Sequence, residues 1–71
     1  MELFVKTLSG QTYTLDVEAS TLVDDIKGKV AGLQGKTSSA NLRLIFSGKQ
    51  LENDRALRDY NILGGSTLYV S

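Results

Sequence analysis

The 71-residue chain contains no cysteine, histidine, proline or tryptophan. Without cysteine there is no disulfide to stabilise the fold and no thiolate to bind a metal. Without histidine the chain lacks the commonest metal ligand and the one side chain that titrates near neutral pH without help. Packing and backbone hydrogen bonds must therefore hold the fold together, and we expect neither a metal site nor a cofactor.

Neither sign of charge predominates, because eight basic and eight acidic residues leave a net charge of zero. A nucleic-acid binder usually has a basic excess or stripe, so we expect no nucleic-acid partner. No stretch approaches the roughly 20 apolar residues that cross a bilayer, so we expect no membrane partner. The first residues are acidic and strand-like, unlike a signal peptide. These features predict a monomer in the cytosol or nucleus.

The length predicts one domain over residues 1–71, which would bury only about 60% of its unfolded surface. Apolar and polar residues alternate over 1–7 and again over 12–17, and that period is typical of strands with one buried face. Gly10 lies in the short loop between them, where a tight turn often needs a positive φ. The first 17 residues therefore predict a β-hairpin.

After Ser20 the apolar period becomes helical. The stripe that it predicts consists of Val23, Ile26, Val30 and Leu33. Thr21, with Asp24 three residues later, fits a capping box, and Gly35 fits a helix stop. Two internal glycines cost roughly 1 kcal/mol each relative to alanine, which burial of the stripe outweighs. We expect a helix that is weaker than its length suggests.

The remainder predicts short strands joined by loops. Residues 42–46 and 66–70 predict strands, 49–51 predict a short return strand, and 36–41 predict a loop. Leu57 is the expected inward anchor of an irregular segment, and the hydroxyl of Tyr60 is expected to bond to the backbone. The predicted fold is α+β, with one helix packed across a mixed sheet of four to five strands.

About half of the positions carry a resemblance to a known family, and they run from one end of the chain to the other. They are Met1, 4–8, Gly10, Thr12, 14–15, 17–18, Lys27, Lys29, Gly35, 43–46, 48–52, Arg55, Leu57, 59–62 and 66–68. With one insertion after Gly35, the chain resembles the ubiquitin family. The resemblance implies the β-grasp fold, in agreement with the predicted order of elements. It also implies a binding surface rather than a catalytic centre.

The resemblance further implies where partner proteins bind. It implies a hydrophobic patch on the first hairpin loop, the third strand and the last strand, bordered by a turn, and a second, smaller exposed site. The patch residues are Leu8, Ile45 and Tyr69, the border residues are Gly48 and Lys49, and the second site is Phe4. Tyr69 stands where the family's modifier has a histidine, which makes one flank of the patch more aromatic.

Ile45 is the residue on which this patch depends. It lies between Leu44 and Phe46, and successive strand side chains point to opposite faces. If its neighbours face the core, Ile45 faces the other side of the sheet. Alternation alone leaves open whether another element covers that side, whereas the resemblance implies an exposed contact residue.

Four lysines keep positions that serve as chain-linkage points in the family: Lys6, Lys27, Lys29 and Lys49. Lys49 is also well explained as a solvated surface lysine beside a turn. The resemblance implies that Lys27 is partly buried, and we expect it to form an ion pair with Asp24 or its neighbours.

Conjugation in this family requires a flexible tail ending in Gly-Gly, whereas this sequence ends at Ser71 and its 63–65 Leu-Gly-Gly precedes a strand. We expect that segment to be a turn. Serines are present without a histidine to activate them, so we expect no enzyme.

The expected function is a ubiquitin-like interaction module, a divergent modifier without its tail. The alternatives are a non-conjugated domain of a larger protein, or a cleavable amino-terminal fusion that helps a ribosomal or other partner fold. The expected partners are ubiquitin-binding domains and receptors of the proteasome or of the conjugation pathway.

Overall fold

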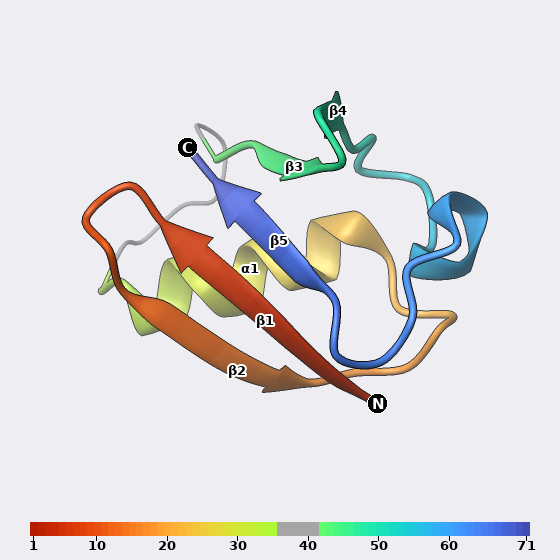
Figure 1. Cartoon of the computed structure of the whole chain (residues 1–71), viewed down its shortest axis with the longest axis horizontal. Coiled ribbons are helices and arrows are strands. Elements are labelled where there is room, and N and C mark those ends of the chain that lie inside the picture. The colour runs from red at the N-terminus through yellow and green to blue at the C-terminus, as the bar shows by residue number, and fades with distance from the viewer. Residues whose placement is uncertain (36–41) are drawn as a thin grey trace.

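The computed structural model describes residues 1–35 and 42–71, and the predicted loop over 36–41, with its insertion, lies outside the described residues. Figure 1 shows a sheet with one helix crossing behind it. In chain order the elements are β1 (Glu2–Thr7), β2 (Thr12–Asp16), α1 (Val23–Leu33), β3 (Leu44–Phe46), β4 (Lys49–Gln50), the short 3₁₀ helix η1 (Leu57–Tyr60) and β5 (Thr67–Val70).

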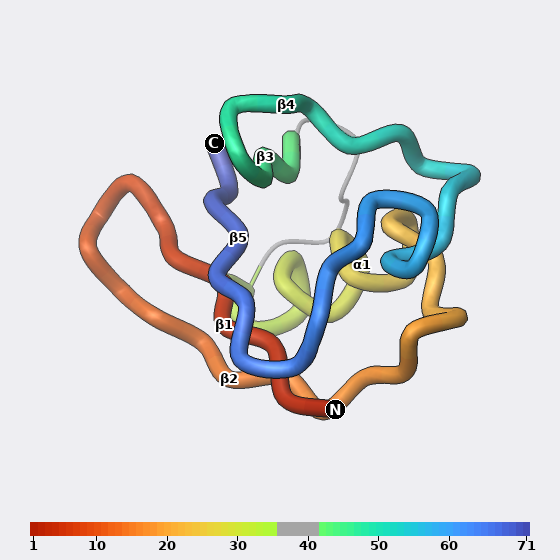
Figure 2. Tube along the Cα trace, turned by 45° about the vertical axis from the view of Figure 1, so that its right-hand side comes forward, coloured from red at the N-terminus to blue at the C-terminus, as the bar shows by residue number. Residues whose placement is uncertain are grey.

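The five strands lie in the order β2-β1-β5-β3-β4. β1 and β5 run parallel, and the other neighbouring pairs are antiparallel. Sequence-distant segments therefore meet in the middle of the sheet, where the last strand lies beside the first (Figure 2). The predicted mixed sheet and single crossing helix are confirmed.

The amino-terminal hairpin forms as its alternation predicts. Leu3 and Val5 are fully buried against the helix side, while Glu2 and Lys6 are exposed. Gly10 adopts a φ of 89° and donates its N–H to the carbonyl of Thr7 at 3.1 Å, which closes the turn. A residue with a side chain would be strained at that φ.

The helix begins differently from the prediction. Leu22 is the N-cap and makes no side-chain cap hydrogen bond, so the expected capping box is wrong. The Thr21 hydroxyl instead accepts a hydrogen bond from the backbone N–H of Glu18 at 2.9 Å, in the preceding turn. Hydroxyl side chains often make such local bonds in competition with a cap. The predicted stop is confirmed, because Gly35 follows the helix with a φ of 73°.

The buried face of α1 is also shifted from the predicted stripe. Val23, Ile26 and Val30 are fully buried as expected, but Leu33 is 53% exposed, so its assignment to the core is wrong. At about 100° per residue, Leu33 is rotated about 60° from Val30 and leaves the contact with the sheet. Lys27 and Ala31 fill buried positions of the helix in its place.

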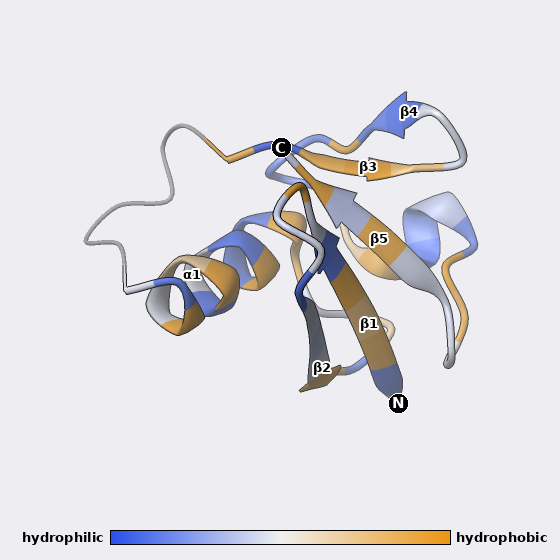
Figure 3. Ribbon diagram, turned by 60° about the vertical axis from the view of Figure 1, so that its left-hand side comes forward, coloured by the Kyte–Doolittle hydropathy of each residue, from blue (hydrophilic) through white to orange (hydrophobic). Residues whose placement is uncertain are grey.

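One core lies between α1 and the sheet. Figure 3 shows apolar positions recurring along β1, β3 and β5, and these residues pack with the helix stripe. The largest fully buried side chains are Leu3, Ile26, Leu44, Leu57, Ile62 and Leu68. Burial of each side chain of this size stabilises the fold by about 1.5–3 kcal/mol, which is how a domain without disulfides holds together.

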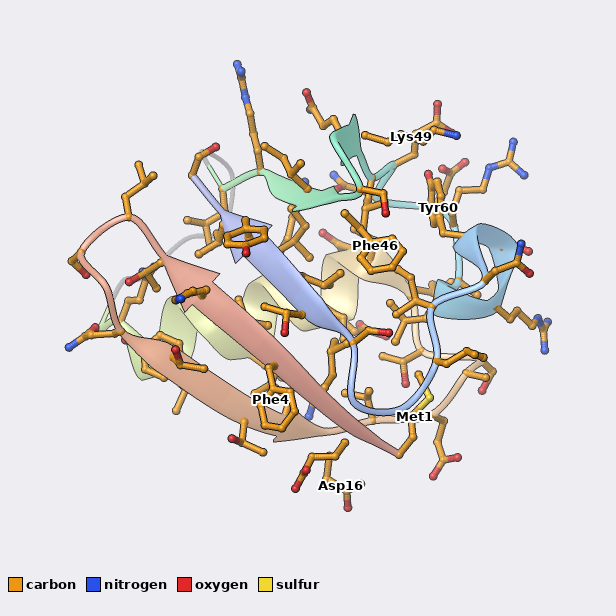
Figure 4. The ribbon with its side chains drawn as sticks, viewed as in Figure 1. Met1, Phe4, Asp16, Phe46, Lys49 and Tyr60 are labelled. Carbon is orange, nitrogen blue, oxygen red and sulfur yellow. The ribbon has the colours of Figure 1, made fainter. Side chains whose placement is uncertain are left out.

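η1 closes the end of the core opposite the hairpin turn. Leu57 is its buried residue, as predicted. The Tyr60 hydroxyl accepts a hydrogen bond from the backbone N–H of Glu52 at 2.9 Å, which confirms its expected bond to the backbone. Phe46 of β3 and Tyr60 of η1 lie near each other, and both pack against the core (Figure 4).

Candidate functional site

The face of the sheet turned away from α1 carries a row of side chains that crosses four strands. Directly paired residues place their side chains on the same face. Lys6 of β1 pairs with Tyr69 of β5, Tyr69 pairs with Ile45 of β3, and Ile45 pairs with Gln50 of β4. Because Tyr69 is 54% exposed and its neighbours Leu68 and Val70 are buried, this row lies on the outer face.

Ile45 occupies the centre of the row. Leu44 on one side is fully buried, and Phe46 on the other packs against the core. Ile45 therefore points outward, where its cross-strand neighbours Tyr69 and Gln50 leave it half-buried. A half-buried isoleucine is held in a fixed position and still offers apolar surface to a partner.

Leu8 extends the apolar surface beyond the end of β1. It is 86% exposed, the highest value among the large apolar side chains of the described residues. A hollow of about 230 Å³ lies beside it, lined in part by Val70 and Ser71 at the end of β5. The fold thus places the hairpin loop next to the strand that carries Tyr69. We call Leu8, Ile45 and Tyr69 the outer patch.

The predicted border residues separate in the structure. Gly48 forms the turn after β3 with a φ of 75°. Lys49 pairs with Phe46 and lines a hollow with Asp59 and Tyr60, so its side chain lies on the opposite face from Ile45. Gln50 occupies the row beside Ile45 instead, and residue types alone could not have shown this, because the register of the short β3–β4 hairpin decides it.

Phe4, the predicted second site, lies on the same outer face, as Figure 4 shows. It is half-buried between Thr14 of β2 and Thr67 of β5. Two residues further along β1 is Lys6, about 7 Å away at the usual strand rise. The second site is therefore contiguous with the outer patch, and Lys6 lies between them.

The four candidate linkage lysines differ in accessibility. Lys6, Lys29 and Lys49 are exposed, whereas Lys27 is only 7% exposed. The Lys27 ammonium donates a hydrogen bond to the side-chain oxygen of Asn53, in the segment after β4. The folded structure thus covers the Lys27 amine.

The expected ion pair of Lys27 is wrong. Within residues 1–35 and 42–71 the ion pairs are the Met1 α-ammonium with Asp16 at 3.6 Å and Arg55 with Glu52 at 3.3 Å. A neutral amide oxygen compensates the buried ammonium instead, and the acidic residues at the start of α1 remain exposed.

Arg55 belongs to a small network of surface charges. The hydrogen bond and negative charge of Glu52, followed by the charges of Asp54 and Asp59, raise the pKa of Arg55. That guanidinium is charged at neutral pH in any case. The described part of the chain contains no group of three or more acidic, histidine or cysteine side chains placed to hold a metal ion. Its helix is too short to cross a membrane.

The Leu63–Gly65 segment is a turn, as predicted. Gly65 has a φ of 84° and donates its N–H to the carbonyl of Glu2 at 2.7 Å. The Ser66 hydroxyl accepts a hydrogen bond from the N–H of Leu63 at 3.2 Å. The two glycines connect η1 to β5 and are fixed by the start of β1.

A five-stranded mixed sheet with one helix across its inner face defines a β-grasp domain. Residues 3–71 match the ubiquitin family, and the chain belongs to that family.

Three of its relatives match it over very different shares of their own length. The chain is 37% identical over 70 residues to ubiquitin-like protein NEDD8 of Dictyostelium discoideum, covering 99% of this chain and 90% of that protein. It is 41% identical over 68 residues to AN1-type zinc finger protein 4 of Mus musculus, covering 96% of this chain and 9% of the relative. It is 41% identical over 64 residues to large proline-rich protein bag6-B of Xenopus laevis, covering 90% of this chain and 6% of the relative. The chain thus spans less than a tenth of the length of two relatives and most of the length of the third.

Proposed function

We propose that this domain is a protein-interaction module whose partners dock on the outer patch of Leu8, Ile45 and Tyr69. The observation that carries the proposal is the direct pairing of Ile45 with Tyr69 on the face that α1 leaves uncovered. Apolar side chains at the centre of a patch, surrounded by polar ones, are the usual anchors of a protein interface. Here Lys6 and Gln50 flank the pair and supply the polar surround.

The size of the patch predicts weak binding at any single contact. The outer patch consists of three apolar side chains, and one of them is already half-buried. We expect dissociation constants in the micromolar range or weaker, on the order of 8 kcal/mol of binding free energy or less. Tyrosine suits such a surface, because its ring is apolar and its hydroxyl remains hydrated.

Two settings for this module fit the relatives. In the first the domain is a divergent ubiquitin-like modifier, which the 90% coverage of NEDD8 supports. In the second it is a fixed domain of a larger protein, which the high identity to small parts of AN1-type zinc finger protein 4 and bag6-B supports. Determining the sequence of the native protein around residue 71 separates the two settings, since a modifier needs a short tail ending in Gly-Gly.

The docking proposal is tested by titrating the domain with a helical ubiquitin-binding peptide while recording amide chemical shifts. We expect the largest shifts at Leu8, Ile45 and Tyr69. Ile45→Ala should weaken binding by about tenfold or more, as anchor truncations do. Leu33→Ala is the control, because Leu33 is an exposed apolar residue of α1 that lies outside the patch. Shifts that avoid the patch, or an Ile45→Ala variant that binds like the parent, would refute the proposal.

A further inference from the structure

Among residues 1–35 and 42–71, Lys27 is the charged residue that the fold buries, with 7% of its surface exposed. The ion pairs of those residues do not include it. Its ammonium donates a hydrogen bond to the side-chain oxygen of Asn53, which is a neutral amide. A buried cation without an opposite charge is costly, because it has lost most of its hydration. Within the described residues, the positive charge of Lys27 is therefore not neutralised.

Lys27 and Asn53 together have hydrogen-bond donors to spare. The ammonium carries three N–H groups, and one of them is directed to the Asn53 oxygen. The amide nitrogen of Asn53 carries two further N–H groups. Neither side chain supplies a negative charge. The pair is therefore suited to a ligand that accepts hydrogen bonds and is negatively charged.

A hollow of about 580 Å³ lies beside this pair, where α1 meets the segment that follows β4. Its lining residues are Lys27, Gln50, Leu51, Glu52, Asn53 and Asp54. All of them except Lys27 and Leu51 are exposed. A ligand can therefore enter the hollow from solvent and reach the buried ammonium.

Backbone hydrogen bonds fix the wall of the hollow. The N–H of Arg55 donates to the carbonyl of Glu52 at 3.2 Å, which closes a turn. The N–H of Asp24 donates to the carbonyl of Asn53 at 3.2 Å, and the N–H of Val23 donates to that of Arg55 at 2.9 Å. These last two bonds hold the turn against the start of α1, the helix that carries the ammonium. The donors of the hollow thus have fixed positions.

The carboxylates at the rim decide which anion fits. Glu52 is paired with Arg55 at 3.3 Å, so its charge is offset. The hydrogen bond and charge of Glu52, followed by the charge of Asp54, raise the pKa of Arg55. A doubly charged anion such as phosphate would be repelled by Asp54 more strongly than a singly charged one. A carboxylate, with one negative charge, matches the single buried ammonium.

We propose that this hollow binds a carboxylate, which neutralises the charge of Lys27. The carboxylate accepts hydrogen bonds from the Lys27 ammonium and from the amide nitrogen of Asn53, and the bond to the ammonium is of the strong, charge-assisted kind. A glutamate side chain of a partner protein and a free small carboxylate share this chemistry. The site is separate from the outer patch and does not depend on it.

The probes are sodium acetate and the capped peptide Gly-Gly-Glu-Gly-Gly, each titrated at constant ionic strength against sodium chloride while amide shifts are recorded. We expect saturable shifts at Lys27, Asn53 and Asp54, with a dissociation constant on the order of 10 mM. The peptide with glutamine in place of its glutamate should cause none. Binding of both probes assigns the site to partner side chains as well as to free carboxylates, and binding of acetate alone assigns it to free carboxylates.

Asn53→Asp is the decisive variant, because it places a carboxylate of the chain itself beside the Lys27 ammonium. The site is then filled from within, and the affinity for acetate should fall about tenfold or more, a loss readily measured by titration. Asn61→Asp is the matched control, since it adds the same charge at a residue outside the lining. Asn61 has a φ of 56°, which aspartate tolerates, so this variant should bind acetate like the parent.

Lys27→Met gives a second test, because it removes the ammonium and should abolish the saturable shifts. A dispersed spectrum shows that this variant is folded, and if the spectrum collapses, Asn53→Asp decides the outcome. The proposal is overturned if acetate causes no saturable shifts, if the shifts lie outside the hollow, or if Asn53→Asp binds acetate like the parent. A purely structural role of the bond between Lys27 and Asn53 predicts no saturable shifts.

Discussion

Replacing Gly28 by alanine should make this protein more stable. Gly28 is exposed in the middle of α1, and a Cβ there would meet nothing within 4 Å. Its backbone is outside the left-handed region, so alanine fits without strain. Alanine restricts the unfolded chain and favours the helix, together worth about 1 kcal/mol at an interior position. Gly32 lies in the last turn, where the gain should be nearer 0.5 kcal/mol.

The measurement is urea unfolding followed by circular dichroism, together with the melting temperature. For a domain of this size, 1 kcal/mol corresponds to about 4–8 °C. The urea midpoint should rise with an unchanged m-value, because the same surface is exposed on unfolding. Gly35→Ala is the control: its φ of 73° makes alanine costly there, and stability should fall by about 1 kcal/mol. If Gly28→Ala leaves stability unchanged or lowers it, the reasoning is wrong.

Two further substitutions test the polar contacts that anchor the segment after β4. Lys27→Met keeps most of the buried side-chain volume but removes the charged hydrogen bond to Asn53. The free energy of unfolding should fall by about 1–3 kcal/mol in the same urea assay. A change near zero would mean that the bond contributes nothing to stability. Tyr60→Phe removes the hydroxyl that accepts the Glu52 N–H and should lower the free energy of unfolding by about 1 kcal/mol. Hydrogen exchange at the Glu52 amide should become faster. An unchanged exchange rate would contradict the assigned bond.

The sequence predicted the elements whose side chains repeat with a clear period. The hairpin, β5 and the body of α1 form where alternation or helical spacing placed them, while β3 is shorter than predicted and begins at Leu44 rather than at residue 42. Local turn chemistry was equally informative, because Gly10, Gly35 and Gly48 all adopt the positive φ that their positions require. These features depend on residues close together in the sequence, so sequence analysis can predict them.

The errors lie where a side chain had a choice of partner. Thr21 bonds back to Glu18 rather than capping the helix, and Lys27 bonds to Asn53 rather than to a nearby carboxylate. Leu33 fits the stripe by spacing but lies outside the helix–sheet contact. The Thr21 bond is local, whereas the Lys27 bond and the exposure of Leu33 depend on segments distant in the chain.

Periodicity and turn residues determined that this chain would make a hairpin, a helix and a closing strand, since those preferences operate over a few residues. Only the tertiary structure decided which side chains meet. The pairing of β3 with β5 places Ile45 beside Tyr69, and the short β3–β4 register turns Lys49 away and brings Gln50 in. The register of β3 against β5 depends on the packing of strands far apart in the chain, whereas the turn between β3 and β4 fixes theirs. The surface offered to partners is therefore a property of the assembled sheet, which no single segment specifies.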